Sequence, residues 1–290
     1  MTRAPHRSAG AVRKSAVRRA ALAAPLAAVA AAAAGAGACG DSRLYDERGM
    51  TVGYRSGTVD DGYLSSGERG TVVITEVNWA GSVEKVEDGY VHDASDVFIE
   101  LRNQHYRPVH LTGWTLEITV GDDSPGAYAD GQTFGGEGHW SATYTIPPRE
   151  NGHAVDTNEY VVVAARRDGA FADADYFIED LALPVDRFEV TLRDLDRRLI
   201  ESAGNVKEPV FGGAWDLVTA RSMERTQLIF SNDGGRNASW HTYAFNAWDG
   251  SAHDALRARI APEFRERTFA SPGLASSPDY SGNTSAGSFE

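Results

Sequence analysis

Cysteine is almost absent, because Cys39 is the only one among 290 residues. A single thiol excludes an intrachain disulfide and any zinc or iron–sulfur site that needs several cysteine ligands. The eight histidines show neither an HExxH motif nor the paired spacing of a metal-binding helix. If the protein is exported, its fold therefore has to depend on core burial, and we expect no cofactor.

Basic residues are scarce after residue 38. The chain has 28 basic and 41 acidic residues, and six of the basic ones lie in residues 1–38, which contain no acid. Residues 39–290 therefore carry a net charge of about −19 at pH 7. Such a field repels phosphate backbones and anionic headgroups, so we expect no general binding to nucleic acid.

The first 38 residues have the order of an export signal. Residues 1–19 are basic, residues 20–34 are mostly alanine, and residues 35–38 are small. A retained membrane anchor is the alternative, although Pro25 interrupts the apolar stretch and alanine contributes little to insertion. We interpret residues 1–38 as a signal peptide, with export by the general or the twin-arginine route left open.

Cys39 follows directly on this signal. The sequence Ala36-Gly37-Ala38-Cys39 resembles a bacterial lipoprotein lipobox, although the usual leucine is replaced by Ala36. The resemblance implies cleavage between Ala38 and Cys39 and a diacylglyceryl group on the cysteine sulfur. Two or more acyl chains hold a protein stably on a membrane. The alternative is a soluble secreted protein in which Cys39 falls near the cleavage site by chance.

Two segments lack sustained apolar periodicity. Residues 39–70 are rich in glycine, serine and charge, which is typical of a flexible tether with a span of about 30 Å. Residues 276–290 are similarly polar and predict a disordered tail. The folded domain is therefore expected over residues 71–275.

Alternation with period two dominates that domain and predicts β-strands. Val97, Ile99 and Leu101 share one face of an expected strand. Trp114, Leu116 and Ile118 do the same after Gly113, whose lack of a side chain suits a tight entry into the strand. We expect these residues to form the structural core. Further strands are expected at residues 71–77, 142–148, 159–165, 186–194, 198–202 and 225–230.

The fold class follows from this pattern. One-sided strands need a second layer to cover their apolar face, and the intervening Gly, Asn, Asp and Pro residues are typical of turns. We therefore predict an all-β antiparallel sandwich. Residues 194–198 are expected to form a hairpin turn, and residues 251–260 are the clearest helical candidate.

Three segments in order carry a family resemblance. ITEVNWAGS (74–82), DVFIELRNQ (96–104) and VHLTGWTLEI (109–118) together resemble the lamin tail domain. Later pieces agree in order: TIPP (145–148), NEYVVVAARRD (158–168), RFEVTLRDLDRRLIES (187–202), SMER (222–225), ASWHT (238–242) and FASPG (269–273). The resemblance covers nearly the whole expected domain.

The resemblance implies an immunoglobulin-like sandwich without a defining catalytic activity. Bacterial members are often secreted or surface proteins, sometimes joined to hydrolases or nucleases. The best known eukaryotic members act in structural assembly and partner binding. Residues 83–95 and 121–141 depart from the family pattern as enlarged loops, where a sandwich can carry its individual function.

Other chemistry has weaker support. Aspartates gather near residues 122–130 and 173–180, but neither run has the EF-hand spacing that would indicate calcium. No GxSxG motif is present.

Trp215, Trp240 and Trp248 lie late in the chain, and exposed tryptophans could stack on sugar rings. Glu100 alternates away from its apolar neighbours, so we expect it to be exposed or paired with Arg102 or a backbone amide.

We therefore expect an exported, lipid-anchored protein of the cell envelope, on the periplasmic or outer surface, whose domain is a binding or structural module without catalysis. Its partner would be a protein or an envelope polymer. Two alternatives stay open: an envelope hydrolase or its accessory subunit, and a carbohydrate-binding module that uses the late tryptophans.

Overall fold

The computed structural model describes residues 69–121, 140–216, 218–226, 233–244 and 250–278, together with four two-residue strands elsewhere. The chain divides into two units, Met1–Arg43 and Leu44–Glu290, and the first lies wholly outside the described residues. The predicted signal peptide and Cys39 therefore lie outside them, as do most of the expected tether and of the loop at 121–141. No helix among the described residues is long and apolar enough to cross a membrane.

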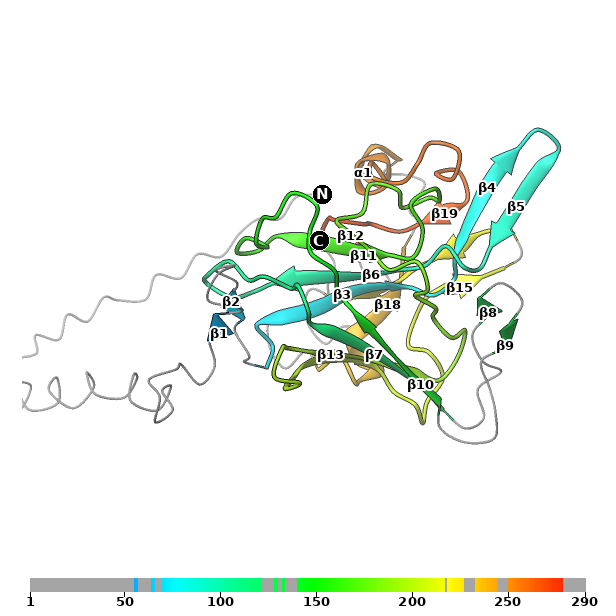
Figure 1. The fold of residues 1–290 in the computed structure, drawn as a ribbon. Coiled ribbons are helices and arrows are strands. Elements are labelled where there is room, and N and C mark those ends of the chain that lie inside the picture. The colour runs from blue at the N-terminus through cyan, green and yellow to red at the C-terminus, as the bar shows by residue number, and fades with distance from the viewer. Residues whose placement is uncertain are drawn as a thin grey trace, which may run out of the picture. The chain divides into compact units, whose positions relative to one another are not determined.

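The larger sheet of the second unit has six strands (Figure 1). Its neighbours pair antiparallel, except for the two strands β11 and β12, which are parallel. In spatial order the strands are β12 (Tyr176–Phe177), β11 (Tyr160–Ala164), β6 (Phe98–Asn103), β3 (Val72–Asn78), β17 (Met223–Arg225) and β18 (Trp240–Thr242).

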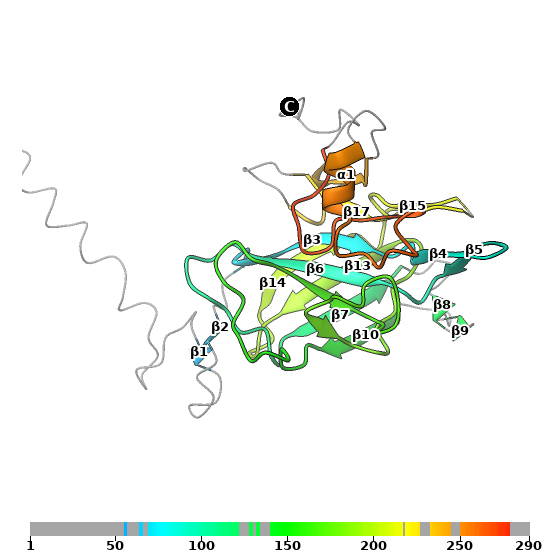
Figure 2. The same cartoon turned by 90° about the horizontal axis from the view of Figure 1, so that it is seen from above.

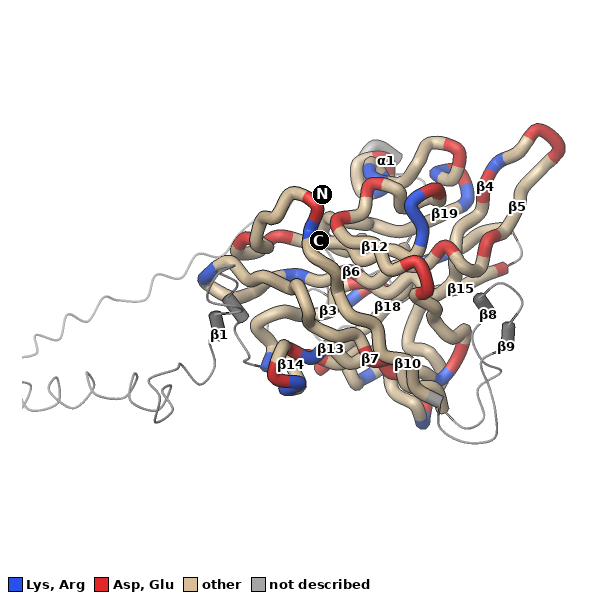
Figure 3. The backbone as a smooth tube through the Cα atoms, in the orientation of Figure 1, with Lys and Arg blue, Asp and Glu red and all other residues tan. Residues whose placement is uncertain are grey.

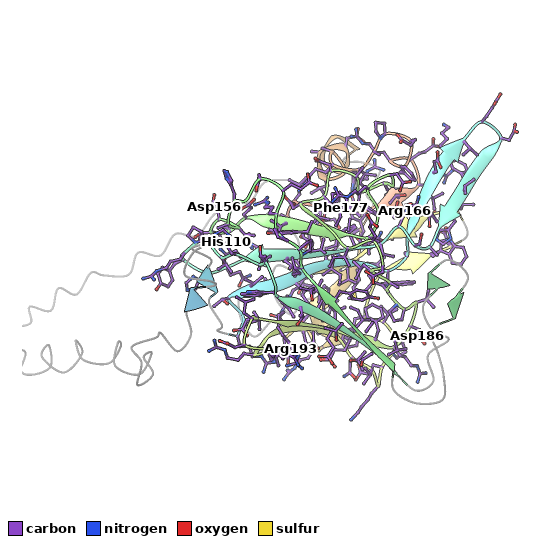
Figure 4. The ribbon with its side chains drawn as sticks, in the orientation of Figure 1. His110, Asp156, Arg166, Phe177, Asp186 and Arg193 are labelled. Carbon is purple, nitrogen blue, oxygen red and sulfur yellow. The ribbon has the colours of Figure 1, made fainter. Side chains whose placement is uncertain are left out.

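The second sheet has four strands, all antiparallel. In spatial order they are β10 (Trp140–Thr145), β7 (Thr115–Val120), β13 (Phe188–Arg193) and β14 (Leu199–Gly204). Burial along β7 alternates strictly, so one face of this sheet is covered and the other faces water. On the outer face Arg193, which Figure 4 labels, forms an ion pair with Glu117 at 3.0 Å.

The main core lies between the two sheets. One cluster of buried side chains joins Ile99 and Met223 of the larger sheet to Leu116 and Val190 of the smaller one. The chain is therefore an all-β, largely antiparallel sandwich, as the alternating pattern predicts. The apolar side chains expected in the structural core are all fully buried: Val97, Ile99, Leu101, Trp114, Leu116 and Ile118.

Gly113 marks the tight entry into β7. Its φ is 80°, and a Cβ atom added there would lie 2.7 Å from Cδ2 of Leu195. Both the left-handed backbone and the close side chain favour glycine at this position. The predicted hairpin turn at 194–198 joins β13 to β14, with Arg197 at a φ of 62°.

A third layer covers the outer face of the six-stranded sheet. Figure 2 shows helix α1 (Gly250–Leu256) on the side of β3 and β6 opposite to β7 and β10. A second apolar cluster joins Phe98 and Val162 of the sheet to Phe171, Ile260 and Phe264. The larger sheet is thus buried on both faces, which agrees with the fully buried pattern of β3.

Small sheets complete the unit. Residues 83–95, expected as an enlarged loop, contain most of the hairpin of β4 (Ser82–Val86) and β5 (Gly89–Asp93), which projects from the body in Figure 1. The other short strands and the 3-10 helix are β15 (Ala214–Trp215), β16 (Ala220–Arg221), β19 (Thr268–Phe269), η2 (Asn237–Ser239), β1 (Arg55–Ser56), β2 (Leu64–Ser65), β8 (Tyr128–Ala129) and β9 (Gln132–Thr133).

Candidate functional site

Three glutamates and a histidine form a line across the larger sheet. Glu76 of β3 lies opposite both Glu100 of β6 and Glu224 of β17, and Glu224 lies opposite His241 of β18. We call these four residues the carboxylate row. Directly opposite residues have Cβ atoms about 5 Å apart, so the strand register itself brings the three carboxylates together.

A register shift in β3 positions this row. The pairing with β6 shifts between Ile74 and Glu76. Ile74 and Val77 both lie in the core cluster, although three positions separate them, and Thr75 and Glu76 fall between them. A bulge of this kind turns an additional side chain out of the core face. Here the extra side chain is Thr75, whose hydroxyl donates to Oε1 of Glu100 at 2.5 Å.

The row is shielded from water. The exposed fraction is 1% for Glu76 and Glu100, 0% for Glu224 and 4% for His241. Carboxylates rarely lie at this depth without partners, because an isolated buried charge is costly. In Figure 3 the other acidic residues, coloured red along the backbone, lie mainly in loops and at strand ends.

Residues 271–277, which we call the closing segment, supply these partners. The backbone N–H of Ser271 donates to Oε1 of Glu76 at 3.0 Å. That of Gly273 donates to Oε2 of Glu100 at 2.6 Å. Both the N–H and the hydroxyl of Ser277 donate to Glu224. A single stretch of chain therefore contacts all three carboxylates.

Burial raises the pKa of each carboxyl in the row. The pKa of Glu100 rises to about 8, mainly because of burial, although the bonds from Thr75 and Gly273 oppose the rise. Burial raises the pKa of Glu76 well above its ordinary value, and the charges of Glu224 and Glu100 raise it further. Burial also raises the pKa of Glu224, whereas His241 and the serine donors lower it. The row is therefore suited to hold protons near neutral pH.

The hydrogen bonds of the carboxylate row leave little capacity for a ligand. Each carboxylate oxygen already lies within hydrogen-bond distance of a hydroxyl or an N–H of the chain. Within the described ranges, no group of three or more His, Cys, Asp or Glu side chains has an arrangement that could hold a metal ion. A separate depression of about 400 Å³ is lined by Asp254, Arg257, Pro262, Arg265, Glu266 and Phe269. There Arg257 donates to the carbonyl of His253 and Arg265 to that of Ile260, so these guanidinium groups hold the loop.

The expectation for Glu100 is resolved by its partners. Its carboxylate is buried rather than exposed, and the backbone amide it pairs with is that of Gly273. Arg102, the other partner considered, donates to Asn158 at 3.1 Å instead. A residue 173 positions away in the chain thus provides the hydrogen bond.

The three late tryptophans do not share a surface. Trp240 is fully buried, its Nε1 donates to the carbonyl of Gly234 at 2.8 Å, and Arg225 lies over its ring. Its placement in a ligand surface is therefore wrong, because the indole is a core side chain with its polar atom satisfied. Trp215 is 45% exposed and stacks on His92 with ring centroids 4.3 Å apart. Trp248 lies outside the described residues.

Two of the aspartates considered for calcium are paired with arginines, and Asp180 is exposed. Asp173 and Asp175 both contact Arg259, and Asp175 also contacts Arg149 at 2.5 Å. The aspartates at residues 122–130 lie outside the described residues. Arginine side chains therefore provide the positive charge next to Asp173 and Asp175.

One sequence feature indicates the carboxylate row, namely a glutamate inside an otherwise apolar strand, but the prediction of each strand by itself does not use it. Residues 71–77 are apolar on both faces, which predicts a central strand, and Glu76 lies within them. A carboxylate in a strand covered on both sides has to be buried and paired. The residues opposite Glu76 follow from the strand register, which the sequence does not give. Ser271, its hydrogen-bond donor, could not be assigned from sequence spacing either.

No protein-family model matches this chain, and no curated protein shows a significant match to it.

Proposed function

We propose that this chain is an exported lipoprotein, anchored through Cys39, whose β-sandwich acts as a binding or structural module of the cell envelope. The observation that carries the proposal is the order of a basic stretch, an alanine-rich stretch and small residues ending at the only cysteine. The sandwich fold supports it, since such folds present loops and strand edges to partners. The resemblance to the lamin tail domain favours assembly over catalysis.

The anchor is tested in a bacterial host by replacing the cysteine. We expect the wild-type protein in the membrane fraction, labelled by an alkyne fatty acid, with a mature N-terminus at Cys39. Cys39→Ser removes the acceptor sulfur, so this variant should be unlabelled and recovered in the soluble fraction. The double variant Cys39→Ser/Ser42→Cys moves the thiol by three positions and should behave like the single variant.

Two results would contradict the anchor. One is a Cys39→Ser protein that stays in the membrane fraction while the wild type takes up no label. The other is a mature protein whose N-terminus lies before Cys39. The partner of the module is tested separately, by cross-linking in intact cells. Proteins that cross-link to the wild type but not to the soluble Cys39→Ser variant are neighbours that depend on the anchor.

Trp215 favours a carbohydrate-binding module as a second candidate. One face of its indole packs on His92, whose Nε2 is held at 2.8 Å from the carbonyl of Ala80, and nearly half of the tryptophan is exposed. A flat, fixed aromatic ring is the surface on which sugar rings stack.

The candidate is tested by sedimentation with insoluble cell-wall polysaccharides. Trp215→Ala should weaken the affinity about 5- to 150-fold, because stacking on one aromatic side chain contributes about 1–3 kcal/mol for nucleic-acid bases, whose flat rings stack in a similar way. Tyr106→Ala is the matched control, since Tyr106 is an exposed aromatic side chain in the segment after β6. Equal binding by wild type and Trp215→Ala, at equal melting temperature, would exclude this site.

A further inference from the structure

Ser271 lies between two carboxylates of the row. Its Oγ is 2.6 Å from Oε1 of Glu224 and 3.1 Å from Oε2 of Glu76. A serine hydroxyl has one hydrogen to donate, so it can satisfy only one of these two contacts as a donor. The other contact is a hydrogen bond only if the carboxyl group carries a proton and donates to Oγ.

The geometry favours Glu76 as the protonated partner. The shorter distance places the serine hydrogen toward Glu224. Glu224 also accepts the N–H and the hydroxyl of Ser277 and lies 3.8 Å from Nε2 of His241, all of which favour its ionised form. The strongest charge effects on Glu76 come from Glu224 and Glu100, and both disfavour its ionisation.

Other groups face the row from the surrounding elements. The hydroxyl of Ser222, which donates to the carbonyl of Phe269 at 3.4 Å, lowers the pKa of Glu76, and the charge of Arg259 lowers the pKa of Glu100. Tyr160 lies within the field of Glu100, and Tyr243 within the fields of Glu224 and Glu76. The charges of Arg257 and Asp254 also act on Tyr243, and Nδ1 of His253 is 3.0 Å from the Tyr243 hydroxyl oxygen.

We propose that the closing segment is a proton-dependent cover of the six-stranded sheet: it stays in place while Glu76 carries a proton, and it opens when Glu76 ionises. Ionisation removes the hydrogen between Glu76 and Ser271 Oγ and leaves adjacent carboxylates repelling each other in a dry site. Opening relieves both effects because water then solvates the row. The proton lost from Glu76 passes to the solvent.

The direction of the pH dependence follows from the pKa of Glu76. The closed form has the raised pKa and therefore binds the proton more tightly than the open form. Closure is thus favoured at low pH and is lost as pH rises through the raised pKa. Glu100, whose pKa is about 8, adds to the effect in the same direction.

Hydrogen exchange of the full chain tests the proposal. We expect the protection of the Ser271, Gly273 and Ser277 amides, corrected for intrinsic exchange, to fall at least about tenfold between pH 6 and pH 9. In Glu76→Gln the amide can donate to Ser271 Oγ and accept from the Ser271 N–H at any pH, so protection should fall clearly less than in the wild type, by the part that Glu100 contributes. Glu87→Gln, an exposed change at the hairpin tip, should keep the wild-type dependence.

Two results would overturn the proposal: wild-type protection that is equal at both pH values, or Glu76→Gln that loses protection with pH as the wild type does. Infrared spectroscopy of the wild type provides a test that needs no variant. A protonated carboxylic acid band should persist above neutral pH and disappear together with the amide protection. A protein with no such band at pH 7 would contradict the assignment, whether or not Glu76→Gln folds.

Discussion

At the scale of single residues, two buried tryptophans differ in one hydrogen bond. Trp114 and Trp240 are both fully buried, so shortening either to phenylalanine removes a similar apolar volume. Nε1 of Trp240 donates to Gly234, whereas Nε1 of Trp114 has no hydrogen-bond partner among the described residues. An unpaired buried donor costs about 1–3 kcal/mol, and the substitution at Trp114 removes that cost.

We therefore expect Trp240→Phe to lower the free energy of unfolding by about 1–3 kcal/mol more than Trp114→Phe. Urea unfolding of both variants, followed by far-ultraviolet circular dichroism, measures the difference. The two variants serve as controls for each other, since ring size changes equally in both. Equal losses would show that the Trp114 indole N–H has a partner that the hydrogen-bond geometry does not show.

At the scale of elements, the sandwich could be predicted where apolar residues alternate. Residues 113–120 alternate strictly because one face of β7 meets the core and the other meets water. Residues 71–77 have apolar side chains on both faces, which predicts a central strand, and this pattern arises because β3 is covered on both sides. The period of the apolar residues and their number therefore indicate whether one face or both faces of a strand are buried.

The third layer could be predicted only in part. The helical candidate at 251–260 overlaps α1 (Gly250–Leu256), but the segments around it have little regular structure, so no period indicates that they pack on the sheet. Ser277 was expected in a disordered tail, yet it is buried against Glu224. Its side chain is polar, and its burial is explained by the hydrogen bonds that it donates to Glu224, a residue far away in the chain. Contacts of this range depend on the register of β3, β6 and β17, which sequence spacing does not provide.

At the scale of the whole molecule, buried carboxyl groups couple folding to protons. Besides the row, Asp96 is buried between Ser82 and the N–H of Ala170, and burial raises its pKa to about 6. In the unfolded chain such a carboxyl has a pKa of about 4. The folded state therefore binds more protons than the unfolded state, so stability is greatest in mild acid and falls as pH rises through about 6 and about 8.

Urea unfolding at pH 5, 7 and 9 should show this decline in the free energy of unfolding. Asp96→Asn removes the part of the pH dependence that comes from Asp96, which lies between pH about 4 and about 6. The amide oxygen can accept from Ser82 and Ala170 without a charge. The variant should be more stable than the wild type by about 3 kcal/mol at pH 7 and nearly equal to it at pH 4. Asp88→Asn, an exposed change in the turn between β4 and β5, should follow the wild type throughout. A wild-type stability that rises from pH 5 to pH 9 would mean that the buried carboxylates are ionised and stabilised by their donors, which would contradict a protonated row as well.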